Sequence, residues 1–149
     1  MLTARDIMNR EVITITDEAT VKELARILSI HQIGGVPVIN DKGKLVGVVT
    51  ESDLIYQTKK VHIPTVITIL DSVFYLENPD KMEEEMKKMA GIKVKDILTS
   101  VPITVTEDTP LDEIATIMAE KSVHTLPVMN KETLVGVIGK KDIIRTLID

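Results

Sequence analysis

Leu45-Val46-Gly47-Val48-Val49-Thr50-Glu51-Ser52-Asp53 decides the fold, because it returns near the end of the chain as Leu134-Val135-Gly136-Val137-Ile138-Gly139-Lys140-Lys141-Asp142. Upstream, Val36-Pro37-Val38 matches Leu126-Pro127-Val128 in the same order. Residue 6 aligns with residue 96, and one residue drops out of the turn that follows Asn40 and its counterpart. The chain is therefore an internal repeat, which predicts two copies of one supersecondary unit.

Each copy is predicted to run from a short opening helix through strand, helix, strand and strand to a final helix. Alternating residues indicate the first strand over 12–16 and 103–106. The central helix of each copy carries apolar residues at the i, i+3, i+4, i+7 spacing of a single buried face. The later strands, 36–40 and 45–50, join through a turn at 41–44 and are almost continuously apolar, which predicts cover on both faces.

A copy of about fifty residues buries its apolar faces poorly by itself, so the two copies should share one structure. We predict an α/β (α+β) fold of two β-α-β-β-α repeats, packed sheet to sheet with pseudo-two-fold symmetry. The predicted units are repeat 1 at 1–58, an inter-repeat segment at 59–92 and repeat 2 at 93–149.

The predicted starts of the two central helices do not agree. Thr20 followed by Glu23 forms a capping-box pattern, whereas Thr109 before Pro110 predicts a cap with proline at the first helical position. These caps differ by one position in the repeat alignment, so one boundary is misplaced.

The inter-repeat segment has its own character. Asn78-Pro79 and Gly91 are typical of a helix start and a helix end. The intervening helix would carry a stripe of methionines, Met82, Met86 and Met89. The stripe fits packing onto the chain's own core, or a deformable surface that binds a partner.

Composition excludes several classes of protein. The 149 residues carry a net charge of −5, aromatic residues make up 2%, and there is no cysteine. These values argue against nucleic acid as a partner and exclude disulfides and thiolate metal sites. The N-terminus is too polar for a signal peptide, and the apolar stretch 61–76 is too short and too interrupted to span a bilayer. We predict a cytoplasmic location with no membrane partner.

The Gly-x-x-Thr-x-x-Asp stretch that ends at Asp53 suits recognition of a nucleotide. A carboxylate at the start of a helix can accept hydrogen bonds from the vicinal hydroxyls of ribose, as in dinucleotide folds. The hydroxyl of Thr50 and the free N–H groups of the helix start suit a phosphate. Thr50 and Asp53 also fit a capping box that needs no ligand.

The doubled Gly-x-x-Thr-x-x-Asp and apolar-Pro-Val patterns, in order over nearly the whole chain, closely resemble the CBS-domain family. The chain is similar to a tandem CBS pair, or Bateman module. The resemblance implies an adenine-nucleotide ligand (AMP, ADP or ATP) or S-adenosylmethionine, bound in clefts between the repeats. It also implies that each cleft takes its Asp from one repeat and its opening strand and Pro-Val approach from the other.

The resemblance distributes the predicted binding residues over two clefts. His124 falls where the family places a polar residue that faces phosphate, although it also fits a surface position before a strand. In the second cleft Gly139 replaces the threonine, so we expect the first to be the better site, with Lys140 and Lys141 available to phosphates by charge. The main cleft is predicted to contain Thr50, Ser52, Asp53, Thr104, Val105, Val123, His124, Leu126 and Pro127. The second cleft is predicted to contain Thr14, Ile15, Ile33, Gly34, Val36, Pro37, Lys140, Lys141 and Asp142.

These observations predict a regulatory binding module that senses an adenine nucleotide by changing conformation. No motif of a P-loop, a catalytic triad or a metal site is present, so we expect no enzyme activity, no catalytic cofactor and no metal. The alternative is a dimerisation or partner-binding scaffold without a physiological nucleotide. We further expect a homodimer and an unidentified regulated protein.

Overall fold

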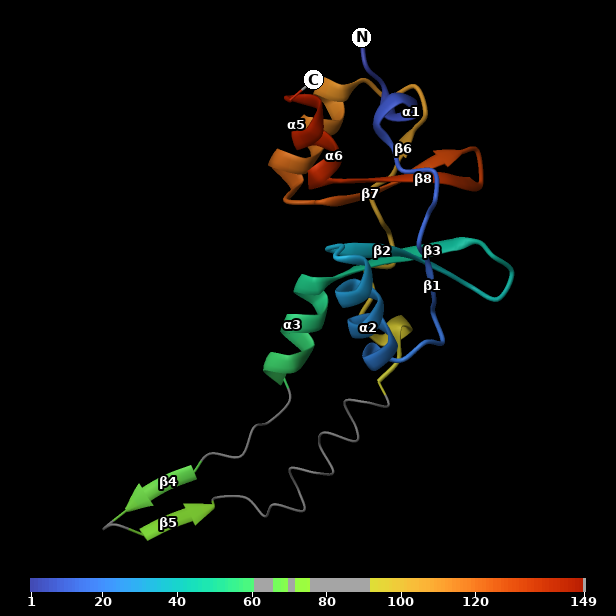
Figure 1. Cartoon of the computed structure of the whole chain (residues 1–149). Coiled ribbons are helices and arrows are strands. Elements are labelled where there is room, and N and C mark those ends of the chain that lie inside the picture. Colours follow the sequence, from blue (N-terminus) through green and yellow to red (C-terminus); the bar gives the residue numbers. More distant parts are fainter. Residues whose placement is uncertain (61–65, 70–71, 76–91, 149) are drawn as a thin grey trace.

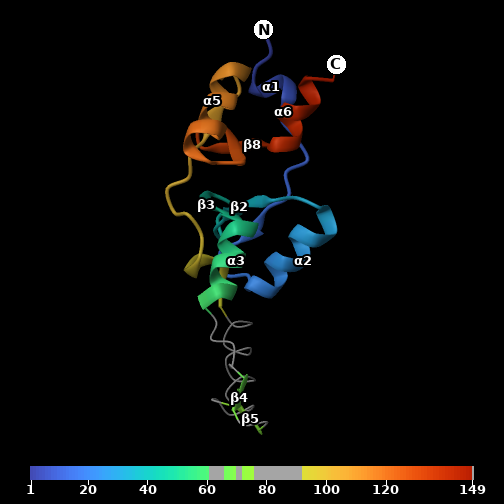
Figure 2. The same cartoon turned by 90° about the vertical axis from the view of Figure 1, so that its left-hand side faces the viewer.

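The computed structural model describes residues 1–60, 66–69, 72–75 and 92–148. Two three-stranded sheets face each other across the middle of the molecule, and helices cover their outer faces (Figures 1 and 2). The predicted α+β architecture of two sheet-to-sheet repeats is confirmed. None of the helices in these ranges has the length and apolar character that crossing a bilayer requires.

The first sheet has the order β1-β2-β3, in which β1 is parallel and β3 antiparallel to the central β2. All residues of β2 except the last are buried, as its continuous apolar sequence predicts. The helices α2 and α3 cover the outer face (Figure 1). The elements are β1 (Ile15–Thr16), α2 (Val21–His31), β2 (Gly35–Ile39), β3 (Leu45–Thr50) and α3 (Glu51–Lys60).

The second sheet repeats this plan with the order β6-β7-β8. Its strands pair in the same senses, and each sheet has a register shift at the equivalent place, after Val38 in β2 and after Val128 in β7. The same pattern of apolar residues therefore builds the same sheet twice. The elements are β6 (Val105–Thr106), α5 (Leu111–Lys121), β7 (Thr125–Asn130), β8 (Thr133–Gly139) and α6 (Lys140–Thr146).

The structure corrects two element predictions and leaves a third untested. The opening strands are two residues long, so residues 12–14 and 103–104 of the predicted strands are irregular. An antiparallel hairpin of β4 (Val66–Ile69) and β5 (Ser72–Tyr75) lies in the inter-repeat segment, where no strand was predicted. The predicted helix from Asn78 to Gly91 and its methionine stripe lie outside the described residues.

The two central helices begin at equivalent positions after all. Thr20 is the N-cap of α2, and its hydroxyl accepts a hydrogen bond from the Glu23 amide at 3.2 Å. In α5 the N-cap is Pro110, one residue later than predicted. Thr109 instead accepts a hydrogen bond from the Thr106 amide at 3.0 Å and closes the preceding turn. The prediction of Thr109 as a cap was therefore wrong.

The opening segment of each repeat crosses to the core of the other. Ala4 in α1 (Ala4–Ile7) and the nearby Met8 lie in the core that holds Ile114 and Leu126 of the second repeat. In the reverse direction, Val94 of the 3₁₀ helix η1 (Val94–Asp96) is fully buried in the core of the first repeat. The two cores are therefore built from both ends of the chain.

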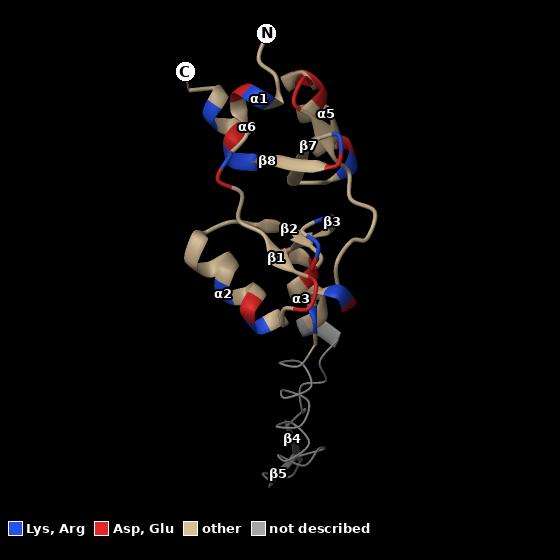
Figure 3. Ribbon diagram, turned by 90° about the vertical axis from the view of Figure 1, so that its right-hand side faces the viewer, with Lys and Arg blue, Asp and Glu red and all other residues tan. Residues whose placement is uncertain are grey.

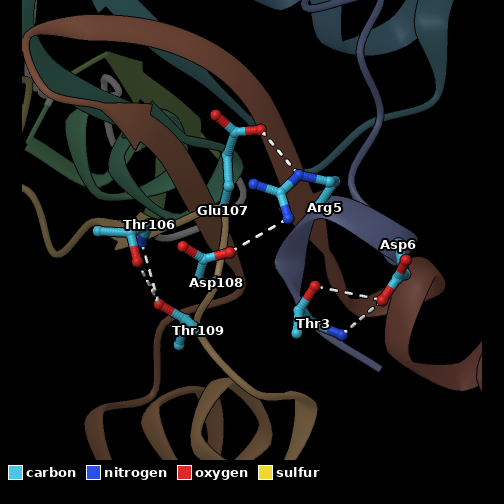
Figure 4. Close-up of polar contacts among 7 residues, drawn as sticks. All are labelled: Thr3, Arg5, Asp6, Thr106, Glu107, Asp108 and Thr109. Atoms are coloured by element: carbon cyan, nitrogen blue, oxygen red, sulfur yellow. Dashed lines mark hydrogen bonds and ion pairs between the residues drawn. The ribbon is translucent and has the colours of Figure 1, made fainter. Parts of the chain in front are cut away.

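Ion pairs join the opening segment of each repeat to the other repeat. The guanidinium of Arg5 in α1 contacts Glu107 at 3.2 Å and Asp108 at 3.1 Å (Figure 4). The hydrogen bond to Glu107, followed by the charge of Asp108, raises the pKa of Arg5 above its ordinary value. Lys93 at the N-cap of η1 and Lys95 within it contact the carboxylate of Glu18 at 2.6 and 2.9 Å. Ion pairs between the two repeats therefore occur at both ends of the described structure.

Candidate ligand site between the repeats

A cavity of about 1180 Å³ lies between the two repeats. The start of α3 lines it from the first repeat and the start of α6 lines it from the second. At the centre the backbone of Gly35 approaches Thr125 so closely that a Cβ at position 35 would lie 2.5 Å from the Thr125 hydroxyl. The cavity consequently has two related ends, one at Asp53 and one at Asp142, which we call the Asp53 cleft and the Asp142 cleft.

Asp53 is held by three hydrogen bonds with Thr50. The Thr50 amide and hydroxyl donate to Oδ2 of Asp53 at 2.9 and 3.1 Å, and the Asp53 amide donates back to the hydroxyl at 3.3 Å. No described residue donates to the other oxygen, Oδ1. A carboxylate has about four acceptor positions, so about two remain for a ligand. The capping box and a free acceptor therefore exist together.

Asp142 is held less firmly. Its Oδ2 accepts one hydrogen bond, from the Gly139 amide at 2.7 Å, because glycine supplies no hydroxyl. Its Oδ1 lies 3.7 Å from the Arg145 guanidinium in the same helix. The carboxylate is 14% exposed and still faces the cavity. The two ends thus share the acid but differ in how it is positioned.

The cap alone does not identify a binding site, because the same arrangement occurs at two other places in the described part of the chain. The Thr3 amide donates to Asp6 at 2.9 Å at the start of α1, and the Lys93 amide donates to Asp96 at 3.1 Å at η1. Neither of these two carboxylates lines the cavity. What distinguishes Asp53 and Asp142 is their position at the inter-repeat cavity.

Contacts between the repeats bring the crossing segments beside each carboxylate. Thr99 pairs with Val48 of β3 through hydrogen bonds of 2.9 and 3.2 Å, which places the 99–103 segment near the Asp53 cleft. Asn9 pairs with Val137 of β8 in the same way, at 2.9 and 3.1 Å. The Lys141 ammonium donates to the Gln32 carbonyl at 3.1 Å, so α6 meets the end of α2. Each cleft therefore combines residues of both repeats.

Ten of the eighteen predicted site residues line the cavity, and the other eight do not. Leu126 and Val36 are fully buried in the two cores, as are Pro37 and Pro127, while Val105 and Ile15 are 5% exposed. Thr104 and Thr14 lie in the irregular segments before the short strands. The residues that line the cavity are Thr50, Ser52, Asp53, Val123, His124, Ile33, Gly34, Lys140, Lys141 and Asp142.

The cavity also contains residues that were not predicted. Glu51 belongs to the quoted Gly-x-x-Thr-x-x-Asp stretch, and Arg145 lies one helical turn after Asp142, so the motif itself was a signal for both. Asn9 and Val101 come from the crossing segments, and nothing in the local sequence indicates that exchange. His31, at the end of α2, lines the cavity as His124 does, while His62 lies outside the described residues. In the described ranges no three His, Asp or Glu side chains are placed to hold a metal ion.

The CBS-domain family model matches the chain twice, over residues 4–59 and 94–149. The chain belongs to the CBS-domain family. It is 30% identical to the protein MJ1426 of Methanocaldococcus jannaschii, across 97% of this chain and 90% of that protein. The tandem CBS pair predicted from the doubled motif is therefore confirmed.

Two solved structures of CBS pairs have the same fold. CBSX2 of Arabidopsis thaliana in complex with AMP superposes with a TM-score of 0.73 at 22% identity, covering 99% of this chain and 97% of CBSX2. The CBS domain pair of the protein MJ0100, in complex with 5′-methylthioadenosine and S-adenosyl-L-methionine, has a TM-score of 0.74 at 24% identity, with 99% and 96% covered. At identities below 25%, these two comparisons show that the chain shares their fold and nothing further.

Proposed function

We propose that this CBS pair is a regulatory module that binds an adenosyl ligand in the cavity between its repeats. The observation that carries the proposal is the pair of carboxylates at the cavity, each placed at the start of the helix that follows a buried strand. Such a carboxylate accepts hydrogen bonds from the ribose hydroxyls in other nucleotide-binding folds. The ligands of CBSX2 and MJ0100 have in common the adenosine group that this chemistry would recognise.

The cavity offers a suitable volume and surface. Small-molecule pockets usually enclose about 300–1,000 Å³, so a cavity of about 1180 Å³ is large enough for two joined sites. Apolar side chains such as Ile33 and Val123 line it beside the polar groups. A flat base fits between apolar side chains while the carboxylate holds the ribose.

In the Asp53 cleft we propose specific roles for three residues. Asp53 binds the ribose through Oδ1, because Oδ2 is already occupied by Thr50. His124, exposed and at the cavity, faces the first phosphate. Because none of the lining residues 50–55, 99–103 and 122–125 at this end is a lysine or arginine, we expect AMP to bind there at least as well as ATP.

Regulation requires that the ligand prefer one of two conformations. The repeats meet at Gly35 and Thr125 between the two clefts, so a ligand that contacts both repeats would change their relative position. An unidentified partner protein would respond to that change. The module itself catalyses nothing in this proposal, and its cytoplasmic location stays a prediction.

We further propose that the module forms a homodimer. Ile55 of α3 and Ile144 of α6 occupy equivalent positions and are 68% and 57% exposed, and Leu147 is 82% exposed. A pair of matching apolar positions suits an isologous interface with a second copy. Analytical ultracentrifugation at micromolar concentration should give twice the monomer mass of 16.5 kDa, and a monomer at all concentrations would contradict the proposal.

Calorimetric titration of the full chain with adenosine, AMP, ADP, ATP and S-adenosylmethionine tests the binding function. We expect saturable binding of at least one of them and a rise in melting temperature, since a ligand that binds only the native state stabilises it. GMP is the control for base selectivity. If no adenosyl compound binds while the fold and dimer are intact, the scaffold alternative replaces this proposal.

A further inference from the structure

The two ends of the cavity carry opposite charge, although they derive from one repeat. At equivalent positions of α3 and α6, Glu51 is replaced by Lys140 and Ser52 by Lys141. One turn later Tyr56 is replaced by Arg145. The carboxylates Asp53 and Asp142 stay the same. The repeat therefore keeps the group suited to ribose and changes the charges around it.

A second hollow of about 430 Å³ extends the Asp142 cleft. It shares Asn9, Glu11, Asp142 and Arg145 with the larger cavity and adds Arg10 to the lining. The residue equivalent to Arg10 in the second repeat is Ser100, so this cation also occurs at one end only. Basic residues gather where β8 leads into α6 (Figure 3). The positive surface thus continues from α6 to the N-terminal crossing segment.

The two clefts differ in the net charge of the residues that line them. Around Asp142 the lining cations are Arg10, Lys140, Lys141 and Arg145. The lining carboxylates there are Asp142 and Glu11. Glu51 also borders this cleft, because its Oε1 lies 3.6 Å from where a Cβ would stand at position 34, which is a glycine. The 50–55, 99–103 and 122–125 lining residues of the Asp53 cleft include Glu51 and Asp53 and no lysine or arginine. Even with Glu51 assigned to both ends, the Asp142 cleft is cationic and the Asp53 cleft is anionic.

The lysines of the Asp142 cleft are available to a ligand. Lys140 has no hydrogen bond or ion pair with any described residue, and Lys141 has only its contact with the Gln32 carbonyl. That carbonyl is neutral, so it positions the Lys141 ammonium without cancelling its charge. Two ammonium groups beside a carboxylate suit a ligand with a ribose at one end and several negative charges at the other.

We propose that the clefts sort ligands by charge. The Asp142 cleft binds an adenosine di- or triphosphate through its polyphosphate, and the Asp53 cleft binds an adenosyl compound with one phosphate or none. This inference rests on the proposed adenosyl-binding function and adds which charge class each cleft accepts. A chain with two such sites would respond to the ratio of the two ligand classes.

The test exchanges the charges between the ends. Lys140→Glu with Lys141→Ser gives the Asp142 cleft the side chains of its counterpart. Calorimetry with ATP and AMP should then show at least a tenfold loss of ATP affinity at one site, with AMP binding at the other site unchanged. The reciprocal variant, Glu51→Lys with Ser52→Lys, should raise the ATP affinity of the Asp53 cleft. Unchanged ATP affinity in both exchange variants would overturn the inference.

A matched control separates a local effect from a change in net charge. Lys42 and Lys44 lie in the exposed turn between β2 and β3, away from the cavity lining. Lys42→Glu with Lys44→Ser makes the same change in net charge and should leave ATP affinity within a factor of about two, because exposed charges beyond about 10 Å are screened at 0.1 M salt. An equal loss of ATP affinity in this control would also overturn the inference.

Inorganic tripolyphosphate distinguishes this inference from the proposed function. We expect it to bind the wild-type chain at one site, to weaken with added salt, and to fail to bind Lys140→Glu/Lys141→Ser. If tripolyphosphate behaves in this way and no adenosyl compound binds, the cationic cleft stands and the adenosyl function falls. If adenosyl compounds bind and tripolyphosphate does not, the charge sorting is wrong. Far-ultraviolet circular dichroism verifies that every variant is folded.

Discussion

The two repeats have nearly the same backbone and different cleft chemistry. Strand order, strand sense and the register shift after Val38 and Val128 are the same in both. At the clefts, Thr50 has become Gly139 and Glu51 has become Lys140. Core positions are constrained by packing in both repeats, whereas the exposed residues at the cavity can diverge without loss of the fold. The difference indicates that the two repeats share one backbone scaffold and present different side chains at the two ends of the cavity.

Removal of either cavity carboxylate tests this difference most strongly. Asp53→Ala should weaken the tighter AMP site by about 2–4 kcal/mol, which corresponds to about thirty- to a thousandfold, because hydrogen bonds to a charged acceptor are lost. Asp142→Ala should leave that site nearly unchanged. Calorimetric isotherms for both variants measure the effect. The assignment of the tighter site would be reversed if Asp142→Ala proved the more damaging change.

Each of these substitutions also removes a helix cap, which costs about 0.5–2 kcal/mol of stability. Asp6→Ala is the matched control, because Asp6 accepts from the Thr3 amide and hydroxyl at 2.9 and 3.2 Å, much as Asp53 accepts from Thr50. Asp6 does not line the cavity. It should lower stability by a similar amount and leave nucleotide affinity intact.

The crossing segments provide a second contrast. A Cβ at Gly47 would lie 2.5 Å from the backbone oxygen of Thr99, whereas at Gly136 it would lie 2.5 Å from the sulfur of Met8. A backbone cannot give way easily, but the methionine side chain can adopt another rotamer. We expect Gly47→Ala to cost about 1–3 kcal/mol and Gly136→Ala about 0.5–1.5 kcal/mol in the free energy of unfolding. Urea denaturation compares the two, and equal costs would show that the segments are equally adaptable.

Gly139→Thr restores to the second repeat the residue that the first has. There is room for the side chain, since the nearest atoms to a Cβ at position 139 lie at 3.8 Å, and φ is −113°. The new hydroxyl can donate to Asp142 as Thr50 does to Asp53. Replacing a glycine N-cap is worth a few tenths of a kcal/mol to about 1 kcal/mol, so thermal unfolding should shift upward slightly. A lower melting temperature would mean that the β8–α6 junction does not adopt the geometry of β3–α3.

Acid should weaken the contacts of Glu18 with Lys93 and Lys95. Hydrogen bonds from Lys93 and Lys95 lower the pKa of Glu18 to about 2, from an ordinary value of 4.5. A lowered pKa in the folded state means that the contribution to stability is full above pH 4.5 and is lost as pH falls toward 2.

Glu18→Gln should therefore flatten the pH dependence of the urea midpoint between pH 4.5 and 2. The effect is small because this ion pair is exposed. Glu120→Gln is the control, since Glu120 is exposed and has no ion pair with any described residue. If both variants follow the wild-type profile, the Glu18 contacts contribute nothing in solution.

Much of the fold could be predicted because periodicity and repetition are local signals. The continuous apolar run over Val36-Pro37-Val38 indicated a buried strand, and its second copy indicated a second sheet. The exchange of α1 and η1 could not be predicted, because Ala4 and Val94 have the same apolar character whichever core receives them. The lengths of β1 and β6 were overestimated for a related reason: the alternation over residues 12–16 and 103–106 begins before the hydrogen-bonded ladder does.

The lining of the cavity could be predicted where the motif itself supplies the side chains. Asp53, Asp142 and Lys141 lie in the motif or at its end, and all three line the cavity. Val36 and Leu126 are buried in the two cores instead, because the strands that carry them are covered on both faces. Arg10 was missed because it enters from a segment that crosses between repeats.

The exchange of opening segments makes each half of the chain dependent on the other for assembly. A fragment of residues 1–60 lacks Val94, which fills its own core, and carries Ala4, which belongs to its partner's. The separated halves should therefore be poorly folded and should recover structure when mixed in equal amounts, as a fragment-complementation pair. An excess of one half would instead tend to trade its opening helix with a second copy of itself, as in domain swapping. A break in the connecting segment should therefore leave the two halves associated through this reciprocal insertion, without a covalent link.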